Sequence, residues 1–208
     1  IRDGKMSPEN IHIYEKLNIT GGSMDGSGNA DDGYVIRGGR MFDYEQYPAL
    51  WNVLSEIPAI SDKNISVYEE IKNFNERIQT NSKARLVDRN GQITDVSSMG
   101  FNESDRMTLI KLMAKSEKSL EDITIEDFFS PHFFTTNFWY MWATTFAFEP
   151  WHSVLEFKRY LHIFIHEFPR INNLSGVKRS LYNQYDSIIL PVELWLKEQG
   201  VIFEYDCE

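Results

Sequence analysis

The sequence predicts a mixed α/β fold (α+β mixed), in which part of a βαβ domain is combined with an aromatic-rich helical segment. Residues 10–16 alternate apolar and polar side chains, which favours a short strand. Residues 186–205 read as a helix, a stop at Gly200 and a second strand, the order found in parallel sheets. Residues 128–148 carry no formal charge if His132 is neutral, and ten of these 21 residues are aromatic, which favours a buried helix.

Length, charge and cysteine content narrow the class of protein. The 208 residues are enough for one domain, or one and a half, with a sizeable core. The net charge of −10 would repel a polyanion, so we expect no nucleic-acid partner, although local arginines could still bind a small anion. The single cysteine, Cys207, can form no internal disulfide, which favours a reducing, cytoplasmic compartment.

The first part of the chain combines short elements with glycine-rich connections. Residues 1–4 resemble the last turn of a helix, so we expect the chain to be an internal piece of a longer protein. Residues 20–33 are rich in glycine, serine and aspartate and predict a loop, either a surface connection or a ligand-binding loop. A strand-like run follows at residues 33–36.

Helical spacing of apolar residues dominates the rest of the chain. Residues 66–79 begin with Ser66 and Glu69, the spacing of a capping box. An Arg-Asn-Gly turn between two strand-like runs predicts a hairpin near residues 84–96. We expect further helices at residues 43–56, 104–115, 119–127 and 186–199, and a final strand at 201–205.

The aromatic run at residues 128–148 has two interpretations. It is long enough for a membrane span, but its serine, proline, asparagine and threonines argue for a buried helix instead. Its rings could form an ordinary core or the wall of an apolar tunnel. A helix should follow at residues 150–168, with Pro150 in its first turn. Its His162 and His166 have a spacing that can hold a metal, but we expect ordinary helix histidines and no metal site.

Glycines and arginines near residue 38 predict a loop system around an anionic ligand, and we expect a dinucleotide. Residues 33–40 read Gly-Tyr-Val-Ile-Arg-Gly-Gly-Arg, in which arginine forks suit phosphate and glycines allow close backbone approach. Glu15 ends the first strand and has two interpretations. It is either the acid that binds a ribose at the end of a strand in Rossmann-like folds, or an ordinary surface glutamate. The sequence contains no G-x-G-x-x-G, Walker loop or G-x-S-x-G elbow.

Seven segments form longer and more specific motifs. They are Ile-His-Ile-Tyr-Glu at 11–15, Gly-Gly-Ser-Met-Asp-Gly at 21–26, Tyr-Val-Ile-Arg-Gly-Gly-Arg at 34–40, Asn-Phe-Trp at 137–139, Phe-Ala-Phe-Glu-Pro-Trp-His-Ser at 146–153, Arg-Tyr-Leu at 159–161 and Tyr-Asn-Gln-Tyr at 182–185. Over nearly its whole length the chain thereby resembles the oleate hydratases, also called the myosin-cross-reactive antigens.

The resemblance implies an FAD-dependent enzyme that adds water across the cis-9 double bond of unsaturated fatty acids, as from oleate to 10-hydroxystearate, without net redox change. It also implies a homodimer with peripheral membrane contact in the full-length protein. We therefore expect residues 1–60 to be a partial FAD-binding Rossmann-like domain and residues 61–180 a mainly helical substrate-domain segment. Residues 181–208 would return a helix and a strand to the FAD-binding sheet, and the isolated fragment would be inactive.

The resemblance also implies roles for single residues. Tyr160 matches the tyrosine proposed to protonate the alkene, although from its helix alone it would be an ordinary packing residue. Met41 stands where many members carry a glutamate proposed to activate water, and a thioether cannot act as a base. Met41 therefore keeps two alternatives open, a flavin-dependent lipid oxidoreductase and an isomerase of polyunsaturated fatty acids. The expected FAD-binding residues are Glu15, Gly21, Gly22, Ser23, Met24, Arg37, Gly38, Gly39 and Arg40.

Overall fold

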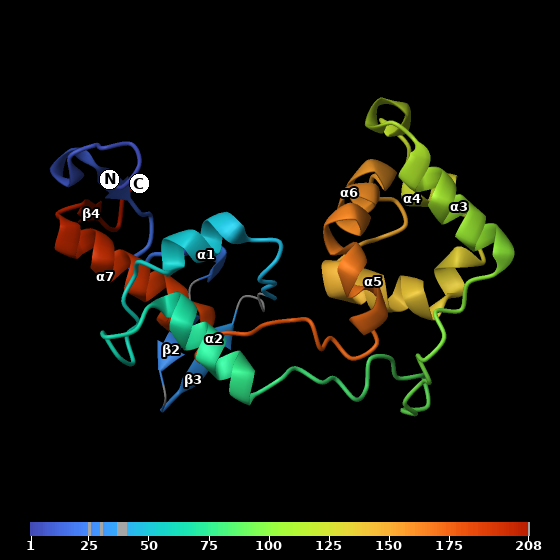
Figure 1. Ribbon diagram of the computed structural model, residues 1–208, viewed down its shortest axis with the longest axis horizontal. Coiled ribbons are helices and arrows are strands. Elements are labelled where there is room, and N and C mark those ends of the chain that lie inside the picture. Colours follow the sequence, from blue (N-terminus) through green and yellow to red (C-terminus); the bar gives the residue numbers. More distant parts are fainter. Residues whose placement is uncertain (25, 30, 37–40, 208) are drawn as a thin grey trace. The chain divides into compact units, whose positions relative to one another are not determined.

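The computed structural model is a mixed fold of helices and short strands, which confirms the mixed α/β class (Figure 1). The residues it describes are 1–24, 26–29, 31–36 and 41–207. The chain divides into two compact units. The first combines residues 1–79 with residues 177–208, and the second comprises residues 80–176. The expected family domains, with boundaries near residues 60 and 180, stay a prediction.

The first unit contains a parallel pair of strands from distant parts of the sequence. β1 (His12–Tyr14) pairs with β4 (Ile202–Glu204), and Ile13 lies opposite Phe203. A short 3₁₀ helix, η1 (Pro8–Asn10), precedes β1. Both predicted strands are therefore confirmed in shorter form, and their parallel pairing agrees with the helix–glycine–strand order before β4.

A glycine-rich hairpin replaces part of the expected loop. β2 (Gly26–Asn29) pairs antiparallel with β3 (Gly33–Ile36). Gly28 has a φ of +126°, and a Cβ built on it would lie 2.2 Å from the Gly33 carbonyl oxygen, so no larger residue fits there. The prediction of a loop at residues 20–33 is wrong for the residues of β2. Glycine in this strand allows the two paired backbones to approach closely and does not mark a loop.

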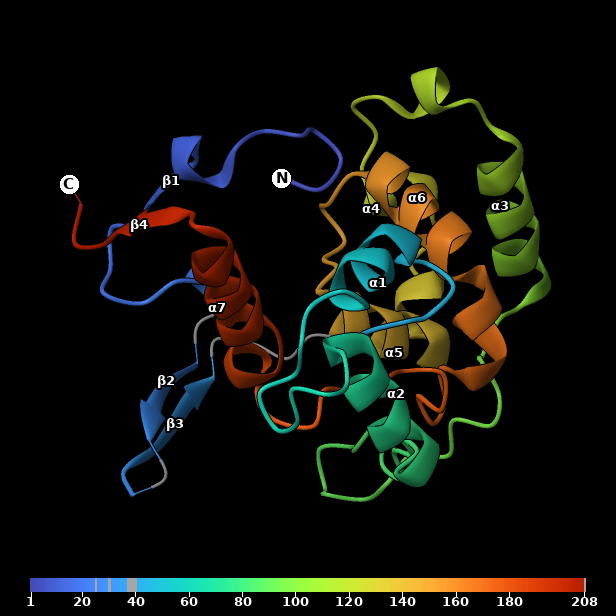
Figure 2. The ribbon, with the colours of Figure 1, turned by 60° about the vertical axis from the view of Figure 1, so that its left-hand side comes forward.

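Helices complete the first unit, and Figure 2 shows α7 leading into β4. The Ser66 hydroxyl accepts a hydrogen bond from the Glu69 N–H, and the Glu69 carboxylate accepts one from the Ser66 N–H, which confirms the capping box. Gly200, with a φ of +101°, ends α7 as predicted. The helices are α1 (Pro48–Leu54), α2 (Val67–Arg77), the π-helical turn η6 (Tyr185–Ile189) and α7 (Leu190–Gln199). The buried core comprises Phe42, Trp51, Leu54, Ile57, Val67, Ile71 and Ile188.

The second unit is helical. Its α helices are α3 (Glu103–Ala114), α4 (Ile125–Phe128), α5 (Asn137–Phe146) and α6 (Val154–Phe164). Its 3₁₀ helices are η3 (Glu117–Leu120), η4 (Phe133–Thr135) and η5 (Ile165–Arg170). Among the described residues, no helix has both the length and the apolar character that crossing a bilayer requires.

Three predicted helices have boundaries that differ from the expected ones, and capping side chains explain two of them. The helix expected at residues 119–127 is divided, because Thr124 caps a separate α4. The aromatic run does not form one helix either: the Thr136 hydroxyl accepts a hydrogen bond from the Trp139 N–H (3.1 Å) and starts α5 inside it. α6 begins after Ser153 rather than at Pro150. Side-chain caps therefore decide the starts of α4 and α5 more than apolar spacing does, whereas Ser153 makes no side-chain cap at the start of α6.

The hairpin predicted near residues 84–96 forms a turn but no regular strands. A single antiparallel bridge joins Val87 and Ile93. The Asp88 carboxylate accepts hydrogen bonds from the Asn90 and Gln92 N–H groups, both at 2.8 Å. The turn chemistry is thus as predicted, whereas the flanking residues are mostly exposed and lack the buried face that stabilises a two-stranded ribbon.

Candidate functional site

The glycine loop after β1 has the backbone geometry that favours glycine. Gly21 and Gly22 have φ values of +110° and +53°. A 3₁₀ helix, η2 (Gly22–Met24), follows, and the Met24 N–H donates to the Gly21 carbonyl (2.8 Å). A Cβ on Gly22 would meet no atom within 4 Å, so its left-handed backbone rather than lack of space demands glycine. The expected ligand residues Arg37, Gly38, Gly39 and Arg40 lie outside the described residues.

Glu15 lies directly after β1, at the carboxyl end of the parallel pair. Its N–H donates to the Glu204 carbonyl (2.9 Å), which extends the β1–β4 ladder by one bond. Its carboxylate accepts a hydrogen bond from the Leu17 N–H (3.0 Å), and its side chain is only partly buried. The carboxylate is therefore oriented by the backbone and still accessible, at the edge where parallel sheets bind ligands.

Met41 lies next to a well-anchored segment of the first unit. The following residue, Phe42, exchanges two backbone hydrogen bonds with Lys178 (3.0 and 2.8 Å). Asp43 is 8% exposed, its carbonyl accepts the Trp51 indole N–H (2.9 Å), and its carboxylate accepts the Glu45 N–H (2.6 Å). The backbone beside Met41 is therefore fixed on the core of the first unit.

Tyr160, on α6 in the second unit, lies among three phenylalanine rings. The ring centroids of Phe146, Phe148 and Phe164 are 5.5, 5.1 and 5.9 Å from that of Tyr160. Within the described residues the Tyr160 hydroxyl makes no hydrogen bond. The contacts with Phe146 and Phe148 are edge-to-face and fix the orientation of the Tyr160 ring, so the phenol is held by its apolar body and its polar end is left for another partner.

The aromatic run predicted to form a core or a tunnel wall packs largely on itself. Phe133 is fully buried, and its ring centroid is 3.9 Å from that of Phe129 and 5.7 Å from that of Trp139. Trp142 is also fully buried, and its indole N–H has no hydrogen-bond partner in the described structure. These contacts account for the burial of the rings as ordinary core. The tunnel stays a prediction.

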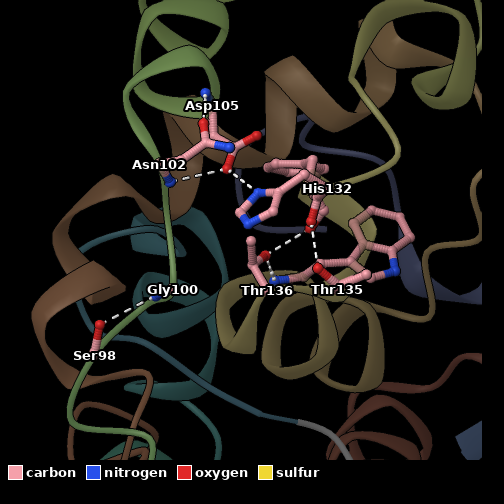
Figure 3. A network of polar contacts seen from close by, with 9 residues as sticks. Ser98, Gly100, Asn102, Asp105, His132, Thr135 and Thr136 are labelled. Carbon is pink, nitrogen blue, oxygen red and sulfur yellow. Dashed lines mark hydrogen bonds and ion pairs between the residues drawn. The ribbon is translucent and has the colours of Figure 1, made fainter.

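A contact between Asp105 and His132 was not foreseen from the sequence (Figure 3). The Asp105 side chain is 1% exposed and its carboxylate lies 2.7 Å from His132 Nδ1. The same carboxylate accepts the Asn102 N–H (3.0 Å) as part of a capping box at the start of α3. The Asn-x-x-Asp spacing could have revealed the capping box, but no residue near Asp105 in the sequence could have revealed its contact with His132. Since the histidine is about half exposed, we interpret this pair as a structural tie.

The two histidines of the metal hypothesis do not share one helical face. His162 is in the last turn of α6, whereas His166 lies in the 3₁₀ helix η5, beside Glu167 (3.5 Å). An (i, i+4) pair converges only while the α-helix continues through both positions. The predicted site residues thus fall into two groups, Glu15, the glycine loop and Met41 in the first unit and Tyr160 in the second.

Comparison with known proteins settles the family. The family model of the MCRA family matches residues 1–208. The chain belongs to the MCRA family. It is 37% identical over 206 residues to an oleate hydratase of Streptococcus pyogenes serotype M49 (strain NZ131), a match that covers 99% of the chain and 35% of that protein. It is 42% identical over 176 residues to a linoleate hydratase of Lactiplantibacillus plantarum, covering 82% of the chain and 31% of the relative.

These matches confirm the family resemblance read from the motifs. Both curated relatives of this MCRA-family chain are named as hydratases of unsaturated fatty acids. The chain spans about a third of the length of either relative. The activity, substrates and partners of the whole protein are therefore matters for proposal.

Proposed function

We propose that the protein containing this chain hydrates the cis-9 double bond of unsaturated fatty acids, converting oleate to 10-hydroxystearate. Membership of a family whose curated relatives are named oleate and linoleate hydratase supports the substrate class. The single structural observation that carries the proposal is the Tyr160 phenol, oriented by aromatic rings and without a hydrogen bond in the described structure. Such a group suits proton transfer to an apolar substrate.

The proposed step uses one proton of the chain and one water. The Tyr160 hydroxyl gives its proton to one alkene carbon, and a water molecule adds to the other. A proton of that water then restores the phenol, so that the net change is the addition of one water. The faces of the Phe146 and Phe148 rings carry negative potential and would favour the cationic carbon that develops between these events. Met41 cannot take the water's proton, because a thioether is not a base.

We propose FAD as the cofactor, bound by a Rossmann-like βαβ arrangement in the first unit. Two features fit a dinucleotide. The first is the Glu15 carboxylate, which is oriented, accessible and placed directly after a parallel strand. The second is the loop that follows, in which Gly21 and Gly22 have positive φ values and the space beside Gly22 is open. Glu15 would accept hydrogen bonds from the ribose, and the glycine loop with Arg37 and Arg40 would surround the rest. Bound FAD would act as a structural or electrostatic group, because the net reaction is not a redox reaction.

The Tyr160→Phe variant of the full-length protein tests this proposal. It keeps the ring and its contacts but removes the proton, so we expect it to lose most of the hydration rate, on the order of 100-fold or more. Tyr140→Phe is the matched control, because Tyr140 lies on α5 with 47% exposure and should leave the rate unchanged. Hydroxy fatty acid formed from oleate is measured by mass spectrometry. An unchanged rate in Tyr160→Phe would remove the role given to this residue.

Met41 favours a second candidate of a different class, a flavin-dependent lipid oxidoreductase or an isomerase of polyunsaturated fatty acids. Without a carboxylate at this position the protein would have no group there to activate water. The mass of the product separates the three reactions. Hydration adds the mass of one water, oxidation removes two hydrogens, and isomerisation leaves the mass unchanged. We further propose that the whole protein is a cytoplasmic homodimer that contacts membranes peripherally.

A further inference from the structure

A hydrogen-bond network in the first unit is centred on the buried side chain of Glu193. This residue lies in the first turn of α7 and is 8% exposed. Its carboxylate accepts hydrogen bonds from the Thr20 hydroxyl, the Lys197 ammonium group (2.6 Å) and the Tyr205 hydroxyl (2.5 Å). Glu193 thereby joins three segments: the connection after β1, helix α7 and the residue directly after β4.

The charge on this network is balanced within the unit. Lys197 lies four residues after Glu193 on α7, and its Nζ is 5.2 Å from the Phe203 ring centroid and 5.0 Å from that of Tyr205. Burial alone would raise the pKa of Glu193, but the hydrogen bonds from Lys197, Thr20 and Tyr205 outweigh it and lower the pKa. The acceptor is therefore a carboxylate, which makes stronger hydrogen bonds than a neutral group.

Thr20 links this network to the glycine loop. Thr20 is 8% exposed and immediately precedes Gly21 and Gly22. These glycines have no side chains whose contacts could order the loop. Ordering glycine costs more conformational entropy than ordering any other residue, so the loop depends on contacts at its two ends. Met24 packs against the core of the first unit at one end, and Thr20 is held by Glu193 at the other.

We propose that Glu193 is a positioning residue for the cofactor loop: through the Thr20 hydroxyl it holds residues 21–24 in the conformation that receives FAD. This inference rests on the FAD dependence proposed above. It gives a role in cofactor binding to a residue on α7 that itself need not touch the cofactor. Glu193 is far from the loop in sequence. The role is inferred from the folded chain, in which the Thr20 hydroxyl after β1 donates to the Glu193 carboxylate on α7.

The test uses the full-length protein with Thr20→Val, Thr20→Ser and Glu198→Gln. Valine keeps the shape of threonine but cannot donate, whereas serine restores the donor. Glu198 is the control, because it lies on the same helix with its side chain 63% exposed. We expect Thr20→Val to weaken FAD affinity about tenfold, the loss expected for one buried hydrogen bond to a charged group. Thr20→Ser should bind within about twofold of wild type, and Glu198→Gln like wild type.

Hydrogen–deuterium exchange of the FAD-free proteins gives a second readout. Thr20→Val should speed exchange in the peptide containing the Met24 amide, which donates to the Gly21 carbonyl, without speeding it elsewhere. Unchanged exchange in that peptide, or a general loss of protection across the unit, would overturn the inference even if FAD binds. If Thr20→Val speeds exchange only in this peptide but the wild-type protein binds no FAD, the proposed cofactor is refuted. The role of Glu193 in cofactor binding is then refuted with it.

Discussion

Replacing Asp105 with alanine should destabilise the second unit by about 2–3 kcal/mol. Two interactions are lost together. The capping box at the start of α3 loses the acceptor for the Asn102 N–H, worth about 1 kcal/mol. The contact of the carboxylate with His132 Nδ1 is also lost, and a hydrogen bond to a charged group contributes roughly 1.5–3 kcal/mol. We take the lower end of that range, because His132 is 48% exposed and water can replace the carboxylate.

Asp105→Asn separates the two contributions. The amide oxygen can still accept the Asn102 N–H, but the negative charge facing His132 is gone, so the loss should be about 1 kcal/mol smaller than for alanine. Glu103→Ala is the control, since Glu103 is exposed in the same helical turn and should change stability by less than about 0.5 kcal/mol. Adding His132→Ala completes a double-mutant cycle with an expected coupling above about 0.5 kcal/mol.

Urea unfolding followed by tryptophan fluorescence is the assay, because Trp139 and Trp142 lie in the core of this unit. With a slope of about 2 kcal/mol per molar urea, the midpoint for Asp105→Ala should fall by about 1–1.5 M at unchanged slope. A midpoint within error of Glu103→Ala would refute the reasoning. A zero coupling to His132 would refute the part that depends on the contact between the Asp105 carboxylate and His132 Nδ1.

Two further predictions concern local structure in the first unit. Ser66→Ala should lower the free energy of unfolding by about 1 kcal/mol. The backbone N–H and the hydroxyl of Ser66 both donate to the Glu69 carboxylate and hold its pKa below the ordinary value. This stabilisation is present above the ordinary pKa and is lost as pH falls through the lowered one, and alanine removes only the share contributed by the hydroxyl. The difference in melting temperature between wild type and Ser66→Ala should therefore narrow in acid, because the hydroxyl's hydrogen bond to the carboxylate is lost there, and a constant difference would contradict this. Gly200→Ala places a side chain at a φ of +101° and should cost about 1 kcal/mol or more, measured by thermal melting; equal melting temperatures would be unexpected.

Features encoded over a few residues could be predicted from the sequence. The capping box of Ser66 and Glu69, the stop at Gly200 and the turn at residues 88–92 each depend on side chains close along the chain. The two parallel strands were also foreseen, because their patterns and order are local. Family membership could be read for the same reason, since its motifs are contiguous.

Features that depend on distant residues could not be predicted. Thr20 and Glu193 are 173 positions apart, and Asp105 and His132 are 27 apart, so no window of sequence contains both partners of either pair. The strand β2 was missed because its glycines signal a loop in isolation and acquire another meaning only beside β3. Within the candidate site, the positions of Tyr160 and its phenylalanines came from the fold, whereas the role of the tyrosine came from the motif.

Incubation of the full-length protein with oleate in water labelled with heavy oxygen (¹⁸O) tests the central proposal most directly. Addition of solvent water across the double bond predicts a hydroxy fatty acid that carries one heavy oxygen atom on the carbon chain. A product without the label, or a product with the mass of oleate or two hydrogens fewer, would contradict hydration and favour the isomerase or the oxidoreductase.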